Sequence, residues 1–175
     1  MSTPTRILMT GSRDWTDREL IEQGLRAAAA LAMVPAGSTD VVLVHGAARG
    51  ADALAADVAD QLGWATEAHP ADWNTHGRSA GHRRNHKMIA AGAQIVVGFP
   101  IGRMDEGASR GTWGCLAAAT TAGLPTMVVW KDRLFPSGQH SARILAQAVD
   151  PFGHTPDLIG HQASVALRDI HPLPF

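Results

Sequence analysis

The sequence predicts an α/β protein: a three-layer sandwich with a mostly parallel sheet of about five strands, followed by a C-terminal appendage. Short apolar runs rich in β-branched residues, such as residues 41–44, indicate strands that are buried on both faces. These runs alternate with amphipathic or alanine-rich segments of helical periodicity. Such alternation is typical of right-handed strand–helix–strand crossovers, which place helices on both faces of one sheet.

The N-terminal part of the chain predicts one strand and one helix. Residues 6–10 form an apolar run that ends at a glycine. Thr16 or Asp17 then caps a helix whose apolar residues recur with helical spacing as far as Leu31. The segment 35–38 contains a proline and a glycine, and these residues end the helix.

The central part predicts two further strands, each followed by a helix. The strand at 41–44 leads through a loop of small residues into a helix from about 51 to 62, which Gly63 ends. A third strand is expected at 64–69, and a polar loop joins it to a helix from about 80 to 91.

The sheet is completed by a fourth strand at 94–99 and a fifth at 125–130, with a helix from about 111 to 122 between them. We therefore expect one domain over 1–130 and a C-terminal extension over 131–175 that packs on it.

The extension is less regular in its pattern. Residues 137–149 have the spacing of a helix capped by Ser137. Thr155 and Pro156 are suited to open another helix, whereas residues 163–168 fit a strand equally well.

Composition excludes several classes of protein. The formal net charge is -1 and the sequence pI is about 6.7, so no overall field attracts nucleic acid or anionic lipid. Cys115 is the single cysteine, which precludes an internal disulfide and fits a reducing compartment. No apolar stretch approaches the roughly 18 residues of a membrane span, and residues 7–9 are too short for a signal-peptide core. We expect a cytoplasmic protein without a membrane partner.

Ligands of open parallel sheets bind at the carboxyl ends of the strands. The segments that follow the predicted strands are therefore the ligand-side loops, and they are 11–16, 45–52, 70–79, 99–111 and 131–137.

The loop at 45–52 has the character of an anion site. Gly46 and Gly50 allow a close backbone approach, and the helix that follows points free N–H groups and its positive dipole end into the same space. The loop is neither a Walker motif nor a dinucleotide fingerprint. Asp52 lies in the first helical turn, where it either orients a ribose hydroxyl or only complements the helix dipole.

Other side chains support an anionic ligand. Gly11, Ser12 and Arg13 combine close approach, a hydroxyl and a guanidinium, although a tight turn with an exposed arginine explains them equally well. His82 and His86 have the i, i+4 spacing of metal ligands, but the adjacent cationic residues favour an anion, so no metal is predicted. Trp15, Trp73 and Trp113 lie in or beside ligand-side loops, where an indole either stacks on a base or fills the core.

In this order the motifs resemble the YspA-like branch of the SLOG superfamily over about residues 5–130. The residues that carry the resemblance, together with Trp15, are the candidate ligand-binding residues: Gly11, Ser12, Arg13, Trp15, His45, Gly46, Ala48, Gly50, Ala51, Asp52, Asp72, Trp73, Arg84, Asn85, Met88, Gly111 and Thr112. The resemblance implies a Rossmann-like fold, a small nucleotide-derived ligand, no required cofactor and a homo-oligomer.

One departure from the superfamily concerns catalysis. In its phosphoribohydrolases, an arginine in Arg-x-x-x-Met and a glutamate in Gly-Gly-x-Gly-Thr-x-x-Glu carry the hydrolysis. Arg84 and Met88 match the first pattern, but Cys115 stands at the glutamate position. A neutral thiol is a poor substitute for a carboxylate beside an oxocarbenium-like transition state.

Three functions follow from this resemblance. The first is binding or sensing of a small nucleotide-type ligand. The second is an N-glycosidase with a relocated carboxylate, for which the candidates are Asp14, Asp52, Asp72, Asp105 and Glu106. The third is a single-stranded DNA binder like DprA, which the net charge of -1 disfavours.

Overall fold

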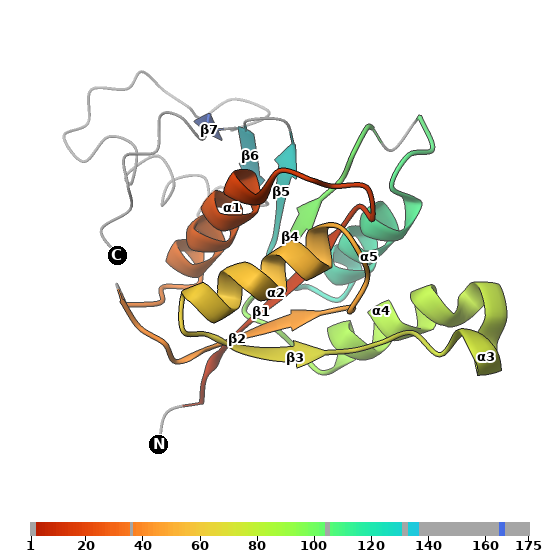
Figure 1. The fold of residues 1–175 in the computed structure, drawn as a ribbon, viewed down its shortest axis with the longest axis horizontal. Helices are drawn as coiled ribbons and strands as arrows, with labels where there is room; N and C mark the ends of the chain where they lie inside the picture. Colours follow the sequence, from red (N-terminus) through yellow and green to blue (C-terminus); the bar gives the residue numbers. More distant parts are fainter. Residues whose placement is uncertain (1–2, 36, 104–105, 131–132, 137–164, 167–175) are drawn as a thin grey trace.

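The computed structural model describes residues 3–35, 37–103, 106–130, 133–136 and 165–166. Within this part of the chain, one seven-stranded sheet has the order β3-β2-β1-β4-β5-β6-β7 (Figure 1). Its strands are β1 (Thr5–Gly11), β2 (Val41–His45), β3 (Ala65–Ala68), β4 (Ile95–Phe99), β5 (Thr126–Trp130), β6 (Arg133–Pro136) and β7 (Val165–Ala166). The strands from β1 to β5 pair in parallel, whereas β6 and β7 are antiparallel. The predicted mostly parallel sheet is confirmed.

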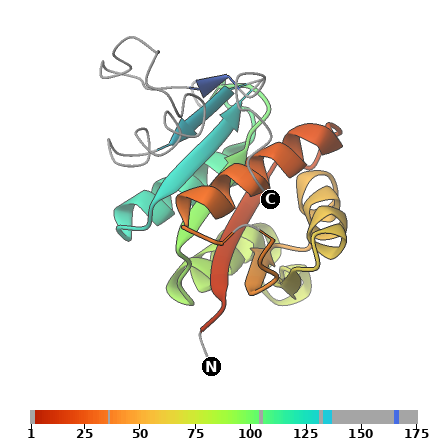
Figure 2. The same cartoon turned by 90° about the vertical axis from the view of Figure 1, so that its left-hand side faces the viewer.

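Helices lie on both faces of this sheet. The helices of the described residues are α1 (Arg18–Leu31), α2 (Ala51–Gln61), α3 (Trp73–His76), α4 (Ala80–Ala90) and α5 (Arg110–Thr121), with a short 3₁₀ turn at Gly77–Ser79. The pair α1 and α2 covers one face and the pair α4 and α5 covers the other, as the two views show (Figures 1 and 2). This arrangement confirms the predicted three layers and the Rossmann-like fold.

The central strand β1 divides the core into two parts. Ile7 and Met9 belong to the cluster beneath α1 and α2, whereas Leu8 belongs to the cluster beneath α4 and α5. All three side chains are fully buried, because successive residues of a strand point to opposite faces and both faces are covered.

The helix ends follow from local sequence. Asp17 is the N-cap of α1 and its carboxylate accepts a hydrogen bond from the Leu20 amide at 3.0 Å. Gly50 precedes α2 with φ of +74°, a conformation that L side chains rarely adopt. A Cβ at Gly50 would also collide with the Arg13 carbonyl group. The loop after β1 and the start of α2 are therefore in backbone contact.

Two segments differ from the sequence prediction. Residues 133–136 were expected within a ligand-side loop, but they form β6, which pairs with β5 from Met127↔Pro136 to Trp130↔Arg133. The polar loop at 70–79 contains the short helix α3. The predicted helix at 137–149 and the one opening at Thr155 lie outside the described residues, whereas β7 falls inside the segment 163–168.

The order of the strands locates the ligand side of the sheet. β1 pairs with β2 on one side and with β4 on the other. The chain leaves β1 toward α1 on one face and leaves β4 toward α5 on the opposite face. The loops after β1 and β4 consequently diverge, and a crevice opens between them, as at the switch point of other doubly wound sheets.

Candidate functional site

A cavity of about 490 Å³ lies at the carboxyl ends of the central strands. Segments that are far apart in the sequence line it: the loop after β1, the loop after β2, α3, α4 and the start of α5. Twelve of the residues predicted from sequence line this cavity, and they are Gly11, Ser12, Arg13, Gly46, Ala48, Asp52, Trp73, Arg84, Asn85, Met88, Gly111 and Thr112. The fold therefore brings most of the predicted motifs to one place.

Asp52 provides a buried carboxylate at this cavity. The residue is only 4% exposed although it lines the cavity. Its Oδ2 atom accepts a hydrogen bond from the Ala48 amide at 3.2 Å, which fixes the carboxylate beneath the loop after β2. Burial raises the pKa of Asp52, and the backbone amide of Ala48 and the Arg84 guanidinium oppose that shift.

The amides of the loop at 45–52 are largely used within the protein. The Ala47 amide donates to Nδ1 of His45 at 3.3 Å, the Ala48 amide donates to Asp52, and the Ala51 amide donates to the Ser12 carbonyl at 3.0 Å. These three N–H groups are therefore not free for a ligand, in contrast to the expectation from sequence. The same bonds hold the loop in one shape.

Arg84 joins three segments of the cavity wall. Its Nη1 atom donates to the carbonyl groups of Gly46 and His69, the latter at 3.2 Å, and its Nε atom donates to Oδ1 of Asn85 at 2.8 Å. Desolvation lowers the pKa of Arg84, and the neighbouring Asp52 opposes this effect. Since a guanidinium stays protonated in proteins, Arg84 is a cation beside the buried carboxylate.

Asn85 extends this network to α5. The side chain is 6% exposed and its Nδ2 atom donates to the Gly111 carbonyl at 3.3 Å. No side-chain hydrogen bond caps α5, because the Ser109 hydroxyl bonds instead to the backbone of Ile101. The first turn of α5 lines the cavity, so its amide groups and positive dipole end face the ligand space.

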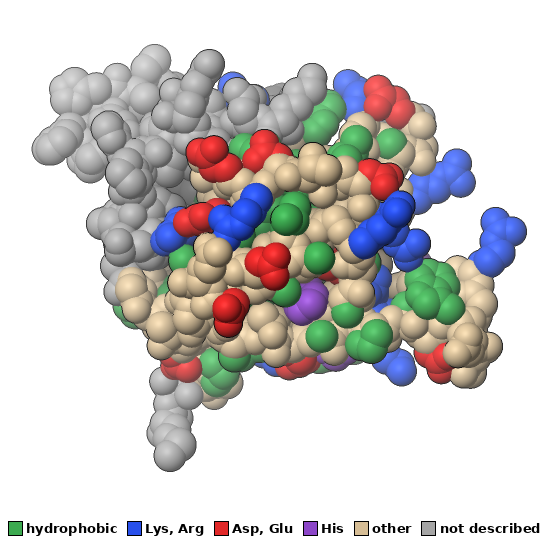
Figure 3. Space-filling view, viewed as in Figure 1, with side chains coloured by type: hydrophobic (Ala, Val, Ile, Leu, Met, Phe, Trp, Pro, Cys, Tyr) green, Lys and Arg blue, Asp and Glu red, His purple; other side chains and the backbone are tan. Residues whose placement is uncertain are grey.

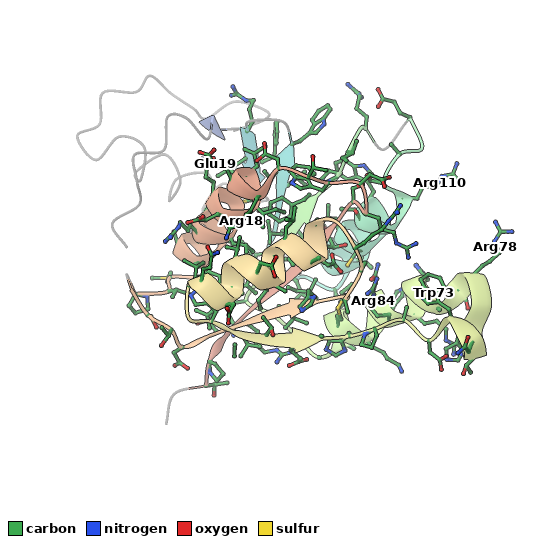
Figure 4. The ribbon with its side chains drawn as sticks, viewed as in Figure 1. Arg18, Glu19, Trp73, Arg78, Arg84 and Arg110 are labelled. Carbon is green, nitrogen blue, oxygen red and sulfur yellow. The ribbon has the colours of Figure 1, made fainter. Side chains whose placement is uncertain are left out.

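The rim of the cavity is cationic and aromatic. Arg13, Arg78 and Arg110 are exposed residues that line it. Figure 4 shows Arg78, Arg84, Arg110 and Trp73 on the same side of the molecule, and Figure 3 shows Lys and Arg side chains gathered there. Arg13 lies over the Trp73 indole, with 5.2 Å between its Cζ atom and the ring centroid. Three of the cavity's arginines thus lie at the rim, whereas Arg84 lies beside the buried carboxylate of Asp52.

Five of the predicted residues do not line the cavity. Trp15 is 7% exposed, packs edge-on against Phe99 and donates from its indole to the Asp17 carbonyl. Asp72 caps α3 by accepting from the Thr75 amide at 2.9 Å. The other three are His45, Gly50 and Ala51, which shape the loop after β2 from behind. Burial lowers the pKa of His45, so its Nδ1 atom stays an acceptor for the Ala47 amide.

Eight further residues line the cavity outside the list of candidate ligand-binding residues, namely Met9, Thr10, Asp14, Arg78, Gly81, His82, Ser109 and Arg110. Of these, Asp14 was considered only as a catalytic carboxylate and His82 only for its metal-ligand spacing. Arg110 directly precedes Gly111 and Thr112, and its position next to that predicted helix start was the available signal. His82 and Arg78 belong to charged segments whose pattern equally fits a solvated surface.

Two further findings concern metals and membranes. Within the described ranges, no group of three or more His, Cys, Asp or Glu side chains is arranged to hold a metal ion. The His82 and His86 rings share a contact of 3.0 Å between their Nε2 atoms. None of the helices described by the structure is long and apolar enough to cross a membrane.

Comparison with known proteins agrees with this picture. The sequence model of the family described as "YspA, cpYpsA-related SLOG family" matches residues 5–76, which include β1, β2 and the loops that follow them. The Gene 61 protein of Mycobacterium phage D29 is 41% identical to this chain over 131 residues, a stretch that covers 70% of this chain and 94% of that protein. No solved structure gives a significant match.

Proposed function

The chain belongs to the YspA, cpYpsA-related SLOG family, and from this membership and the cavity we propose that it binds or senses a small nucleotide-derived ligand. The single observation that carries the proposal is the composition of the cavity. It combines exposed arginines at the rim, an indole and a buried carboxylate within about 490 Å³. A phosphate, a base and a sugar are the groups that these side chains complement.

The phosphate of the ligand binds at the start of α5 rather than on the loop at 45–52. The amides of Ala47, Ala48 and Ala51 are occupied within the protein, whereas the first turn of α5 has no capping side chain. Arg110 and Arg13 line the same cavity and add charge-assisted hydrogen bonds to a phosphate oxygen.

The base stacks on Trp73. This indole is 48% exposed, and it lines the cavity from α3. Trp15, the other tryptophan considered for this role, is buried against Phe99 and has no face toward the cavity. In the free protein Arg13 covers the Trp73 ring, so the arriving base takes the place of the guanidinium, which turns to the phosphate.

Thermal denaturation across a nucleotide panel tests this proposal. The panel contains nucleoside mono- and diphosphates, ADP-ribose derivatives and cyclic dinucleotides, each at concentrations up to the millimolar range. A ligand at 100 times its Kd stabilises the folded protein by about 2.7 kcal/mol, which is a measurable rise in Tm. The absence of any rise throughout the panel would refute the proposal.

A second candidate function, hydrolysis of the N-glycosidic bond, is favoured by the position of Asp52. Cys115 stands where the related hydrolases have a glutamate, and burial raises the pKa of its thiol to about 11, so the thiol is neutral. Among the alternative carboxylates, Asp52 is buried at the cavity, Asp14 is exposed and paired with Arg49, and Asp72 caps α3.

In that reaction the oxygen of a water molecule attacks C1′ of a nucleoside monophosphate, and the C–N bond breaks. The base leaves with the bonding electron pair and takes up the proton that the water loses, relayed by Asp52, and ribose 5-phosphate is the other product. Asp52 would accept the proton of the attacking water. The test is release of free base, which Asp52→Asn and Arg84→Ala should abolish. Binding without release of base would leave the first function alone.

A further inference from the structure

Asp52 is buried in a way that a helix-capping carboxylate does not require. A carboxylate in the first turn complements the helix dipole equally well at the surface, where water solvates it. Asp52 is instead 4% exposed at the cavity, and α2 extends away from it. Its Oδ2 atom accepts a hydrogen bond from the Ala48 amide, and a carboxylate has about four acceptor positions on its two oxygens. The carboxylate therefore has capacity for further hydrogen-bond donors from a ligand.

The charge layout of the cavity defines which part of a ligand reaches Asp52. An ionised carboxylate only accepts hydrogen bonds, so it repels a phosphate and attracts hydroxyl or amino groups. Arg84, the cation beside Asp52, already donates from its Nη1 and Nε atoms to groups of the protein, whereas Arg13, Arg78 and Arg110 lie at the rim with Trp73. If the phosphate and the base are held there, the sugar is the portion of a nucleotide that remains to face Asp52.

A ribose presents two adjacent hydroxyl groups, and both can donate to one carboxylate. A 2′-deoxyribose has lost one of these donors, and its binding would leave Asp52 with less compensation for its burial. We propose that Asp52 receives the vicinal hydroxyls of a ribose and makes the cavity selective for ribonucleotides over 2′-deoxyribonucleotides. This inference rests on the proposed function, because it assumes that a nucleotide occupies the cavity.

Isothermal titration calorimetry of the full chain tests this selectivity. The probes are the four ribonucleoside 5′-monophosphates and the four matching 2′-deoxyribonucleoside 5′-monophosphates. We expect the wild-type protein to bind its best ribonucleotide about tenfold or more tightly than the 2′-deoxy counterpart, as for loss of a hydrogen bond to a charged group. Asp52→Asn should reduce this preference to less than about threefold.

A control on the same helix separates the role of Asp52 from charge alone. Asp57 is an exposed aspartate of α2 that does not line the cavity, so Asp57→Asn should keep the wild-type preference. Equal affinity of the wild-type protein for the two series would overturn the inference and leave the proposed function intact. Retention of the preference in a folded Asp52→Asn variant would overturn it as well. Binding of neither series would refute the proposed function, and this inference with it.

Discussion

Arg13 and Trp73 form a cation–π contact across the cavity mouth, with 5.2 Å between the Arg13 Cζ atom and the centroid of the indole. Arg13 belongs to the loop after β1, and Trp73 belongs to α3. The side chain proposed to bind phosphate and the one proposed to stack on a base are therefore in contact with each other in the free protein. The contact itself contributes only about 0.5–1 kcal/mol at such an exposed site, so a ligand displaces it at little cost.

Removing the indole should weaken nucleotide binding without unfolding the protein. Trp73→Leu is expected to lower affinity by about tenfold, because base stacking contributes about 1–3 kcal/mol. Trp73→Phe keeps a flat ring and should retain most of the affinity. Calorimetric titration with the tightest nucleotide of the panel measures both effects. Equal affinity in the Leu and Phe variants would contradict stacking on Trp73.

The charge of Arg110 should contribute more to nucleotide affinity than the charge of a nearby surface arginine. Arg110→Gln is expected to weaken nucleotide binding by about fivefold to tenfold, because a charge-assisted bond to phosphate is lost. Arg83 is exposed on α4 and does not line the cavity, so Arg83→Gln is the matched control. Affinities measured at two salt concentrations should show a smaller salt dependence for the Arg110 variant alone. An equal loss in both variants would indicate a diffuse field instead of a phosphate contact.

The raised pKa of Asp52 predicts a specific dependence of stability on pH. Between its ordinary pKa of 3.8 and its raised value in the folded state, Asp52 binds more protons in the folded protein than in the unfolded chain. The carboxyl group therefore makes folding less favourable as pH rises through this window. Asp52→Asn should remove that penalty. The free energy of unfolding of this variant should therefore increase relative to that of the wild type as pH rises from about 4 toward 7.

Urea denaturation at several pH values measures this difference. Asp57→Asn, the exposed change on the same helix, should show no comparable gain. A variant Asp52→Asn that loses stability as pH rises, relative to the wild type, would show that the carboxylate is fully compensated within the protein. Asp52 would then have no need of a hydrogen-bond donor from a ligand.

Gly50 should be intolerant of a side chain. Gly50→Ala would force a Cβ against the carbonyl groups of Arg13 and Ser12 in a backbone conformation with φ of +74°. The backbone term alone costs roughly 1–3 kcal/mol. Gly37→Ala is the control, because Gly37 has φ of +72° and nothing within 4 Å of the added Cβ. Chemical denaturation should show a larger loss for Gly50→Ala, and equal losses would mean that the loop after β1 moves aside freely.

The regular part of the fold was predictable because its strands and helices have clear periodicity. Apolar runs located β1, β2, β4 and β5, whereas β3 was placed from its position between Gly63, which ends a helix, and the polar loop after it. The caps and glycines placed most helix ends within one or two residues. The helix α3 was missed because its four residues are too few to show a period. Strand β6 was missed because residues 133–136 show no strand pattern of their own. They form a strand by pairing with the preceding strand β5 in an antiparallel hairpin.

The candidate site was predictable only at the level of its loops. Sequence position placed Asp52 in a first helical turn, but only the fold shows that this carboxylate is buried at the cavity. Trp15 and Trp73 both follow strands, and their fates differ because Trp15 packs on Phe99 whereas Trp73 lies on a short exposed helix. Hydrogen bonds such as those from Ala47 and Ala48 to nearby side chains leave no signature in the sequence.

The most direct test of nucleotide binding in this cavity is an amide NMR titration of the isotopically labelled protein with the tightest nucleotide of the panel. Nucleotide binding in this cavity predicts that the largest shifts come from the backbone amides of residues 110–112 and from the indole N–H of Trp73. Nucleotide binding with shifts confined to other parts of the chain, or no shifts at millimolar nucleotide, would contradict it.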